Sequence, residues 1–153
     1  MKEIALSGNS GLSLEQCLSF HQLIDDVLDE ALKAIKARRA DSACIDAFYN
    51  LVSKYLVKQD KDFYKGLRDW LSASNKSFSM VEFLEYDIKD LKIKLFVFYD
   101  RFLHVHHAGR YQAVLRDWHE LADAVQVHLQ VERKYLFPLL EAQEGLATKI
   151  ASS

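Results

Sequence analysis

Proline and glycine are scarce in this chain: one proline and five glycines occur in 153 residues. These two residue types mark most turns and loops, so their scarcity excludes a turn-rich sheet architecture and favours long helices. About 50% of the residues are apolar, and a chain of this length can bury one sizeable core within a single domain. We therefore expect an all-α protein of one domain.

The sequence also lacks a cysteine framework, an excess of one charge and long apolar runs. Cys17 and Cys44 are too few and too far apart for a disulfide scaffold, and two free thiols fit a reducing cytoplasm. A net charge of -2 gives no general basic surface for phosphates, which disfavours direct nucleic-acid binding and favours a protein partner or a small ligand. No run of about 18 apolar residues occurs, and the first residues lack the apolar stretch of a signal peptide. We expect a cytoplasmic protein that does not enter a membrane.

Four segments repeat apolar residues at alternating steps of three and four, which is the period of a helix with one buried face. The first begins at a capping box formed by Ser13 and Gln16. The second runs to about residue 71, the third fades at residues 104–109, and the fourth starts near Tyr111, with Pro138 placed to kink or tighten its last turns. The four stripes are Cys17, His21, Ile24, Leu28, Ala31 and Ile35; Ile45, Phe48, Val52, Tyr55, Gln59 and Asp62; Leu84, Ile88, Leu91, Leu95, Phe98 and Phe102; and Trp118, Leu121, Val125, His128, Glu132, Leu136 and Leu139.

Long helices joined by short loops make an antiparallel up-down four-helix bundle the expected topology. We expect residues 1–12 to form an N-terminal extension, residues 13–147 to form the bundle, and residues 148–153 to form a C-terminal tail.

Polar residues interrupt the predicted buried stripes on three of the four helices. They are His21, Tyr55, Gln59, Asp62, His128 and Glu132. Burying such groups without partners costs about 1–3 kcal/mol each, so they should hydrogen-bond one another or bind something. The third helix offers leucine, isoleucine and phenylalanine on its inner face. We therefore favour a polar core without a metal or another cofactor.

The alternative is a metal site built from His21, His128 and Glu132, because two histidines and one carboxylate can hold a single iron or another divalent ion. A further group, His104, His106 and His107, lies at the end of the third helix and is better explained as a solvated helix end. No pattern supports a catalytic nucleophile, so we expect no enzyme.

Residues 120–143 resemble the last helix of hemerythrin-like (HHE) domains, which carry His-x3-Glu before an apolar Phe-Pro. His128, Glu132, Phe137 and Pro138 match that pattern, and His21 falls where the first-helix histidine of the family lies. Tyr55 and Gln59 stand where the second helix of the family carries His-x3-Glu. The resemblance therefore implies a degenerate domain, with metal binding or oxygen and redox sensing as the alternative function.

A second resemblance covers nearly the whole chain. Residues 20–30 (FHQLIDDVLDE), 45–67 and 98–103 (FYDRFL) are similar, in order and spacing, to segments of the Rsd/AlgQ family of bacterial sigma-factor regulators. The chain departs from that family at Arg133, where an acid is usual. The resemblance implies an anti-sigma factor that regulates transcription by binding the primary sigma factor of RNA polymerase, chiefly its fourth conserved region.

That region of sigma is a basic helix-turn-helix, so an inhibitor is expected to present acidic side chains together with apolar anchors. The densest acidic patch in the chain lies on the predicted first helix. We expect partner contacts from Asp25, Asp26, Asp29 and Glu30, extended on the second helix by Asp60 and Tyr64.

Overall fold

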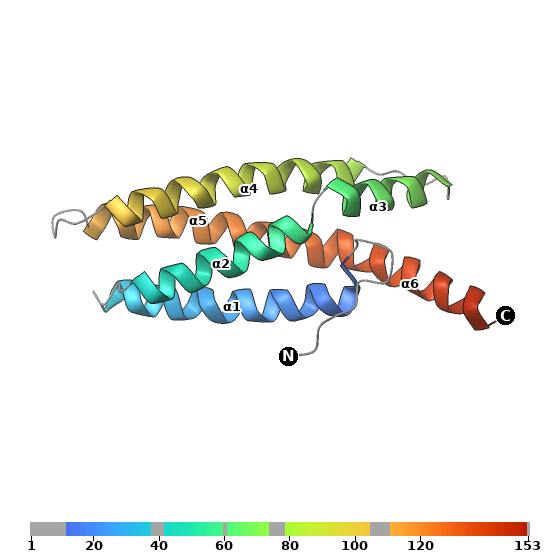
Figure 1. Cartoon of the computed structure of the whole chain (residues 1–153), viewed down its shortest axis with the longest axis horizontal. Coiled ribbons are helices and arrows are strands. Elements are labelled where there is room, and N and C mark those ends of the chain that lie inside the picture. The colour runs from blue at the N-terminus through green and yellow to red at the C-terminus, as the bar shows by residue number, and fades with distance from the viewer. Residues whose placement is uncertain (1–11, 38–41, 60, 74–78, 105–110, 153) are drawn as a thin grey trace.

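The computed structural model describes residues 12–37, 42–59, 61–73, 79–104 and 111–152. Its helices form four rods (Figure 1). The first rod is α1 and the third is α4, whereas the second and fourth rods are divided into shorter helices. The helices are α1 (Leu14–Lys36), α2 (Ser42–Lys58), α3 (Lys61–Ala73), α4 (Ser79–His104), α5 (Tyr111–Val131), η2 (Glu132–Leu136) and α6 (Phe137–Ser152).

The first rod begins at the predicted capping box. The Ser13 hydroxyl accepts a hydrogen bond from the Gln16 backbone N–H at 3.1 Å, and the Gln16 side chain accepts one from the Ser13 backbone N–H at 2.8 Å. These two bonds satisfy two backbone donors that a helix start leaves without intrahelical partners. From this start, α1 places its predicted stripe in the core and its acidic residues in solvent.

The second rod is not the single helix that the sequence predicts from residue 42 to residue 71. It is α2 followed by α3, with the break between Lys58 and Lys61. No glycine or proline lies at this break, so the local sequence carries no strong stop signal. The break instead accompanies tertiary packing, because α3 turns against the start of α4, where Arg68 forms an ion pair with Glu85.

The fourth rod runs through α5, η2 and α6 without a gap. In η2 the helix widens to a π-helix, and the Phe137 N–H donates to the Glu132 carbonyl five residues earlier. Pro138 follows directly. A proline ring clashes with the carbonyl four residues before it in a regular α-helix, and a wider turn relieves that clash. Of the two predicted effects of Pro138, a kink or a tightening of the last turns, the tightening does not occur, because the turn before the proline is widened.

Each rod packs antiparallel against its neighbours: α1 contacts α2, α2 contacts α4, α4 contacts α5, and α5 returns to α1. The result is the predicted all-α, up-down-up-down four-helix domain with one apolar core between the rods (Figure 1). Most of the predicted extension, residues 1–11, lies outside the described residues, and α6 continues through most of the predicted tail to Ser152. Among the described helices, none has the length and apolar character that crossing a membrane requires.

Candidate functional site

Five of the six inward polar residues predicted from the sequence come together at one level of the bundle, whereas the side chain of the sixth, Asp62, lies outside the described part of the chain. His21 lies on α1, Tyr55 and Gln59 at the end of α2, His128 on α5 and Glu132 at the first position of η2. All five are almost fully buried, with exposures of 0–3%. The four rods thus enclose a group of polar side chains, which we call the buried polar cluster.

Glu132 is the centre of the buried polar cluster. Its Oε1 accepts hydrogen bonds from the Tyr55 hydroxyl at 2.9 Å and from His21 Nε2 at 3.0 Å. Its Oε2 accepts a hydrogen bond from the Gln59 amide, and His128 Nε2 lies 3.6 Å away. A buried carboxylate is costly unless it is paired and hydrogen-bonded, and here four side chains from three rods surround one.

His128 connects the cluster to the remaining rod. Its Nδ1 donates a hydrogen bond to Asp87 Oδ2 on α4 at 2.7 Å, a length typical of a charge-assisted bond. The inner face of α4 is apolar, as predicted, but Asp87 at the border of that face was not predicted as a partner of the cluster. Asp87 was missed although a signal existed: it lies three residues after Leu84 and four before Leu91, so it borders the buried stripe.

The charges in the cluster are coupled. Burial by itself lowers the pKa of His128, but hydrogen bonds and the negative charges of Asp87 and Glu132 outweigh it and raise that pKa to about 9. Burial likewise opposes ionisation of Glu132, but its interactions with His128 and His21 outweigh burial and lower its pKa to about 2. At neutral pH the cluster therefore holds an imidazolium between two carboxylates.

Two further groups complete the surroundings of Glu132. Burial raises the pKa of the Cys17 thiol to about 12, which makes it an inert buried group and a poor nucleophile. Tyr64 was expected on a polar outer surface that contacts a partner, and that prediction is wrong, because the side chain is fully buried. Burial, followed by the charge of Glu132, raises the pKa of Tyr64 well above its usual value.

The residues of the metal alternative are His21, His128 and Glu132. Among the described residues, no group of three or more histidine, cysteine, aspartate or glutamate side chains has the geometry to hold a metal ion. His21 donates a hydrogen bond to Glu132 from Nε2, and His128 Nε2 lies 3.6 Å from the same carboxylate. Four buried atoms have no hydrogen-bond partner in the described part of the chain: His21 Nδ1, Gln59 Oε1, Tyr64 OH and His128 Nε2.

The predicted acidic patch lies on the solvent side of α1. Asp25, Asp26, Asp29 and Glu30 are all exposed. Asp25 forms an ion pair at 3.0 Å with Arg133 of η2, and Asp29 forms one at 3.3 Å with Lys33. Asp60, the other residue expected to contact a partner, lies outside the described residues.

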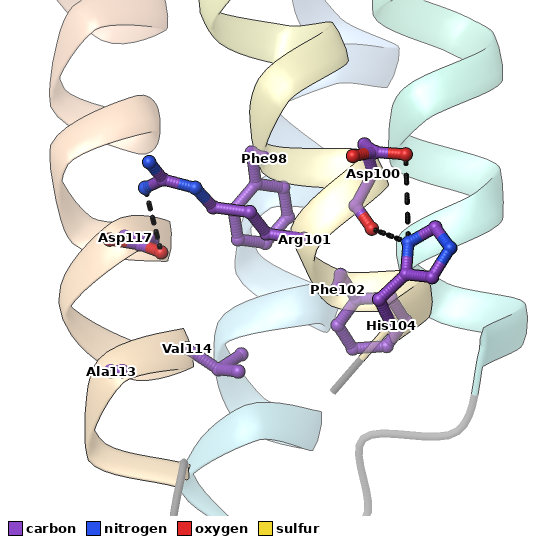
Figure 2. Close-up of a pocket in the computed structure, with 8 residues that line it drawn as sticks. All are labelled: Phe98, Asp100, Arg101, Phe102, His104, Ala113, Val114 and Asp117. Atoms are coloured by element: carbon purple, nitrogen blue, oxygen red, sulfur yellow. Dashed lines mark hydrogen bonds and ion pairs between the residues drawn. The ribbon is translucent and has the colours of Figure 1, made fainter. Parts of the chain in front are cut away.

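A cavity of about 390 Å³ lies at the opposite end of the bundle from the cluster, between the end of α4 and the start of α5 (Figure 2). Figure 2 shows Arg101 reaching from α4 toward Asp117 of α5, with which it forms an ion pair at 3.7 Å. His104 donates a hydrogen bond from Nδ1 to the Asp100 backbone carbonyl at 2.7 Å. His104 therefore forms a hydrogen bond within the last turn of its own helix. His106 and His107 lie outside the described residues.

No protein-family model, no curated protein and no solved structure matches this chain. The two family resemblances therefore rest on the motifs quoted above.

Proposed function

We propose that this protein is a regulator that acts by binding another protein, and that its partner is the primary sigma factor of RNA polymerase. The observation that carries the proposal is the acidic outer face of α1, where four carboxylates stand in solvent within six residues. The resemblance of residues 20–30, 45–67 and 98–103 to the Rsd/AlgQ family supplies the identity of the partner. In this proposal the protein is not an enzyme.

Apolar side chains accompany the acids on the same face. Leu18 and Leu23 are each 51% exposed, and Leu18 lies seven residues before Asp25, which places both on one side of α1. Leu23 is likewise seven residues before Glu30. Charged residues around apolar anchors are the pattern expected of a protein-binding face, since the anchors supply affinity and the charges supply orientation and association rate.

The electrostatic balance of the face suits a basic partner. Lys33 and Arg133 offset two of the four acids through exposed ion pairs, which leaves an excess of negative charge. A basic helix-turn-helix presents lysine and arginine side chains that normally meet phosphates, and these are complementary to carboxylates. Binding through such exposed charges should weaken as salt increases.

The test is a binding measurement between the purified protein and the purified primary sigma factor of its native host. We expect wild-type binding to fall at least about tenfold when Asp25, Asp26 and Asp29 are all changed to asparagine, because each lost rim charge lowers the association rate. A matched control removes three other exposed acids, with Asp69→Asn, Asp123→Asn and Glu141→Gln. The control should bind as the wild type does.

The outcomes separate the two parts of the proposal. If the wild-type protein does not bind sigma factor, the proposed partner is wrong. If the wild type binds and the triple variant binds equally well, the partner stands and the α1 face is excluded from the interface. Equal losses in the triple variant and its control would show a general effect of net charge, which would also exclude a specific role for α1.

A further inference from the structure

Helix α4 is apolar on two faces. Its inner face buries Val81, Leu84, Ile88, Leu91, Leu95 and Phe98 in the core. Its outer face also exposes large apolar side chains: Phe83 (49%), Tyr86 (74%), Ile93 (64%), Phe96 (61%) and Val97 (39%). Figure 1 shows α4 along one edge of the bundle, with no described helix covering its outer side. A single surface leucine needs no explanation, but five large apolar residues on one helix face mark an interaction surface.

These side chains form a stripe along α4, which Lys89 and Asp90 interrupt between Tyr86 and Ile93. Tyr86, Ile93 and Val97 follow one another at steps of seven and four, so they lie on one line along α4, and Phe96 flanks that line. A groove of about 290 Å³ borders the stripe between α4 and α5, with Ile93 and Val97 among its lining residues. We call this surface the outer α4 face.

One charged residue at each edge of the outer α4 face matters for the choice of a partner: Lys92 on one side and Glu120 on the other. Lys92 lies seven residues before Tyr99, which stacks on Tyr49 of α2 at a ring distance of 4.1 Å, so Lys92 lies on the α2 side. Glu120 of α5 lines the groove on the other side. Neither Lys92 nor Glu120 forms an ion pair with another described residue, whereas Lys94 and Arg101, toward the α5 side, are paired with Asp90 and Asp117.

We propose that the outer α4 face binds a second copy of this chain, in a dimer whose two-fold axis runs parallel to α4. In that arrangement the two α4 helices are parallel, and Tyr86 and Ile93 each meet their own counterparts. Lys92 of each copy then faces Glu120 of the other. The antiparallel alternative would bring the two edges that carry Lys92 together, and like charges in contact are unfavourable.

The exposed area of the outer α4 face is compatible with binding a second copy of the chain. Aromatic side chains present roughly 200 Å² each, so the exposed parts of Phe83, Tyr86 and Phe96 offer about 350 Å² per copy. A stable interface buries about 800 Å² per partner. The rings therefore supply nearly half, and Ile93, Val97 and the flanking charged side chains have to supply the rest. Two parallel helices with apolar residues at steps of three, four and seven pack in the manner of a short coiled coil.

The first test is the molar mass of the purified, untagged protein by sedimentation over a range of concentrations. We expect a dimer for the wild type and a monomer for Ile93→Glu, with unchanged helix content, because Ile93 makes no core contact. The matched control is Leu23→Glu on α1, which lies on the opposite side of the bundle (Figure 1) and should remain dimeric. A wild type that is monomeric at every concentration, or an Ile93→Glu variant that remains dimeric, would overturn the proposal.

The second test addresses the direction of the two helices. Lys92→Glu and Glu120→Lys should each weaken the dimer at least about fivefold, and the two changes combined should restore it, because the charges then match again in the exchanged positions. Oxidation of a Tyr86→Cys variant should yield a disulfide-linked dimer, since equivalent residues meet in a parallel pair. If the charge exchange fails to restore the dimer and Tyr86→Cys does not cross-link, the parallel arrangement is wrong.

Discussion

Glu132 shows how a single residue organises this bundle. The side chain is 0% exposed. It remains ionised because Tyr55, Gln59 and His21 donate hydrogen bonds to it and the imidazolium of His128 lies beside it. Spacing in the sequence was sufficient to predict that His128 and Glu132 share one face, because residues four apart on a helix lie above one another. It was not sufficient to find Asp87, whose role depends on which side of α4 meets α5.

Replacing Glu132 with glutamine should destabilise the protein by about 3–5 kcal/mol, because the change leaves the buried imidazolium of His128 with one charged partner in place of two. The measurement is urea denaturation monitored by circular dichroism. The control is Asp25→Asn, which breaks an exposed ion pair with Arg133 and should cost less than about 1 kcal/mol. If the two variants lose the same free energy of unfolding, the buried polar cluster does not contain an ionised Glu132 beside a charged His128.

Stability should depend on pH in a defined way. The folded-state pKa of His128 lies above its unfolded value, from 6.5 to about 9, so its contribution is complete below pH 6.5 and is lost as pH rises through 9. The pKa of Glu132 is lowered from 4.5 to about 2, so its contribution is complete above pH 4.5 and is lost as pH falls through 2. These two groups therefore predict a plateau between pH 4.5 and 6.5.

Urea denaturation across the pH range measures this profile. In a His128→Gln variant the decline above pH 6.5 should be absent or strongly reduced. If the free energy of unfolding falls by the same amount at alkaline pH in that variant, a group other than His128 causes the loss.

At the scale of elements, the π-helix η2 adds the equivalent of one extra residue to the fourth rod, which is otherwise a regular α-helix. It begins at Glu132 and ends just before Phe137, whose ring packs on His21 at a centroid distance of 4.7 Å. The first residue of η2, Glu132, and the residue after its end, Phe137, are therefore both buried at the cluster. A π-turn often marks a site where function or packing has outweighed helix regularity.

If η2 contains one inserted residue, two single deletions made in a Pro138→Ala background should have different outcomes. Deleting the exposed Lys134 should convert η2 to a regular turn and leave Glu132 and Phe137 on their faces, because Phe137 then becomes the fourth residue after Glu132. Deleting the exposed Gln130 should instead rotate Glu132 by about 100° out of the cluster.

Thermal unfolding measures both deletions. The Gln130 deletion should melt at least about 10 °C lower than the Lys134 deletion, since losing a buried charged network is among the costly single changes. Similar melting temperatures would contradict the description of η2 as one added residue.

The break between α2 and α3 is not predicted by the sequence patterns, which indicate a single helix. The stripe of the second helix continues through Phe63, Tyr64 and Leu67, which are all buried, so the apolar period shows no interruption at residue 60. The end of the helix accompanies the packing of α3 against α4 and the inward position of Gln59. Both are contacts between residues distant in the sequence, and they leave no local signal.

At the scale of the whole molecule, the two proposed surfaces are independent. The acidic face of α1 and the outer α4 face lie on opposite sides of the bundle (Figure 1). A dimer formed through α4 would therefore leave two α1 faces open to partners. Linked binding sites of this kind raise overall avidity when the partner can reach both.

The sequence by itself determined the all-α class, the four-rod topology, the capped start of α1 and the inward positions of His128 and Glu132. Each of these follows from local pattern, because helix period and capping depend on residues within a few positions of one another. Only the tertiary structure decided the partnership of Asp87 with His128, the burial of Tyr64, the division of the second rod and the exposure of a second apolar face on α4. These depend on which helix faces meet, and a helical pattern fixes the faces of a helix but not their neighbours.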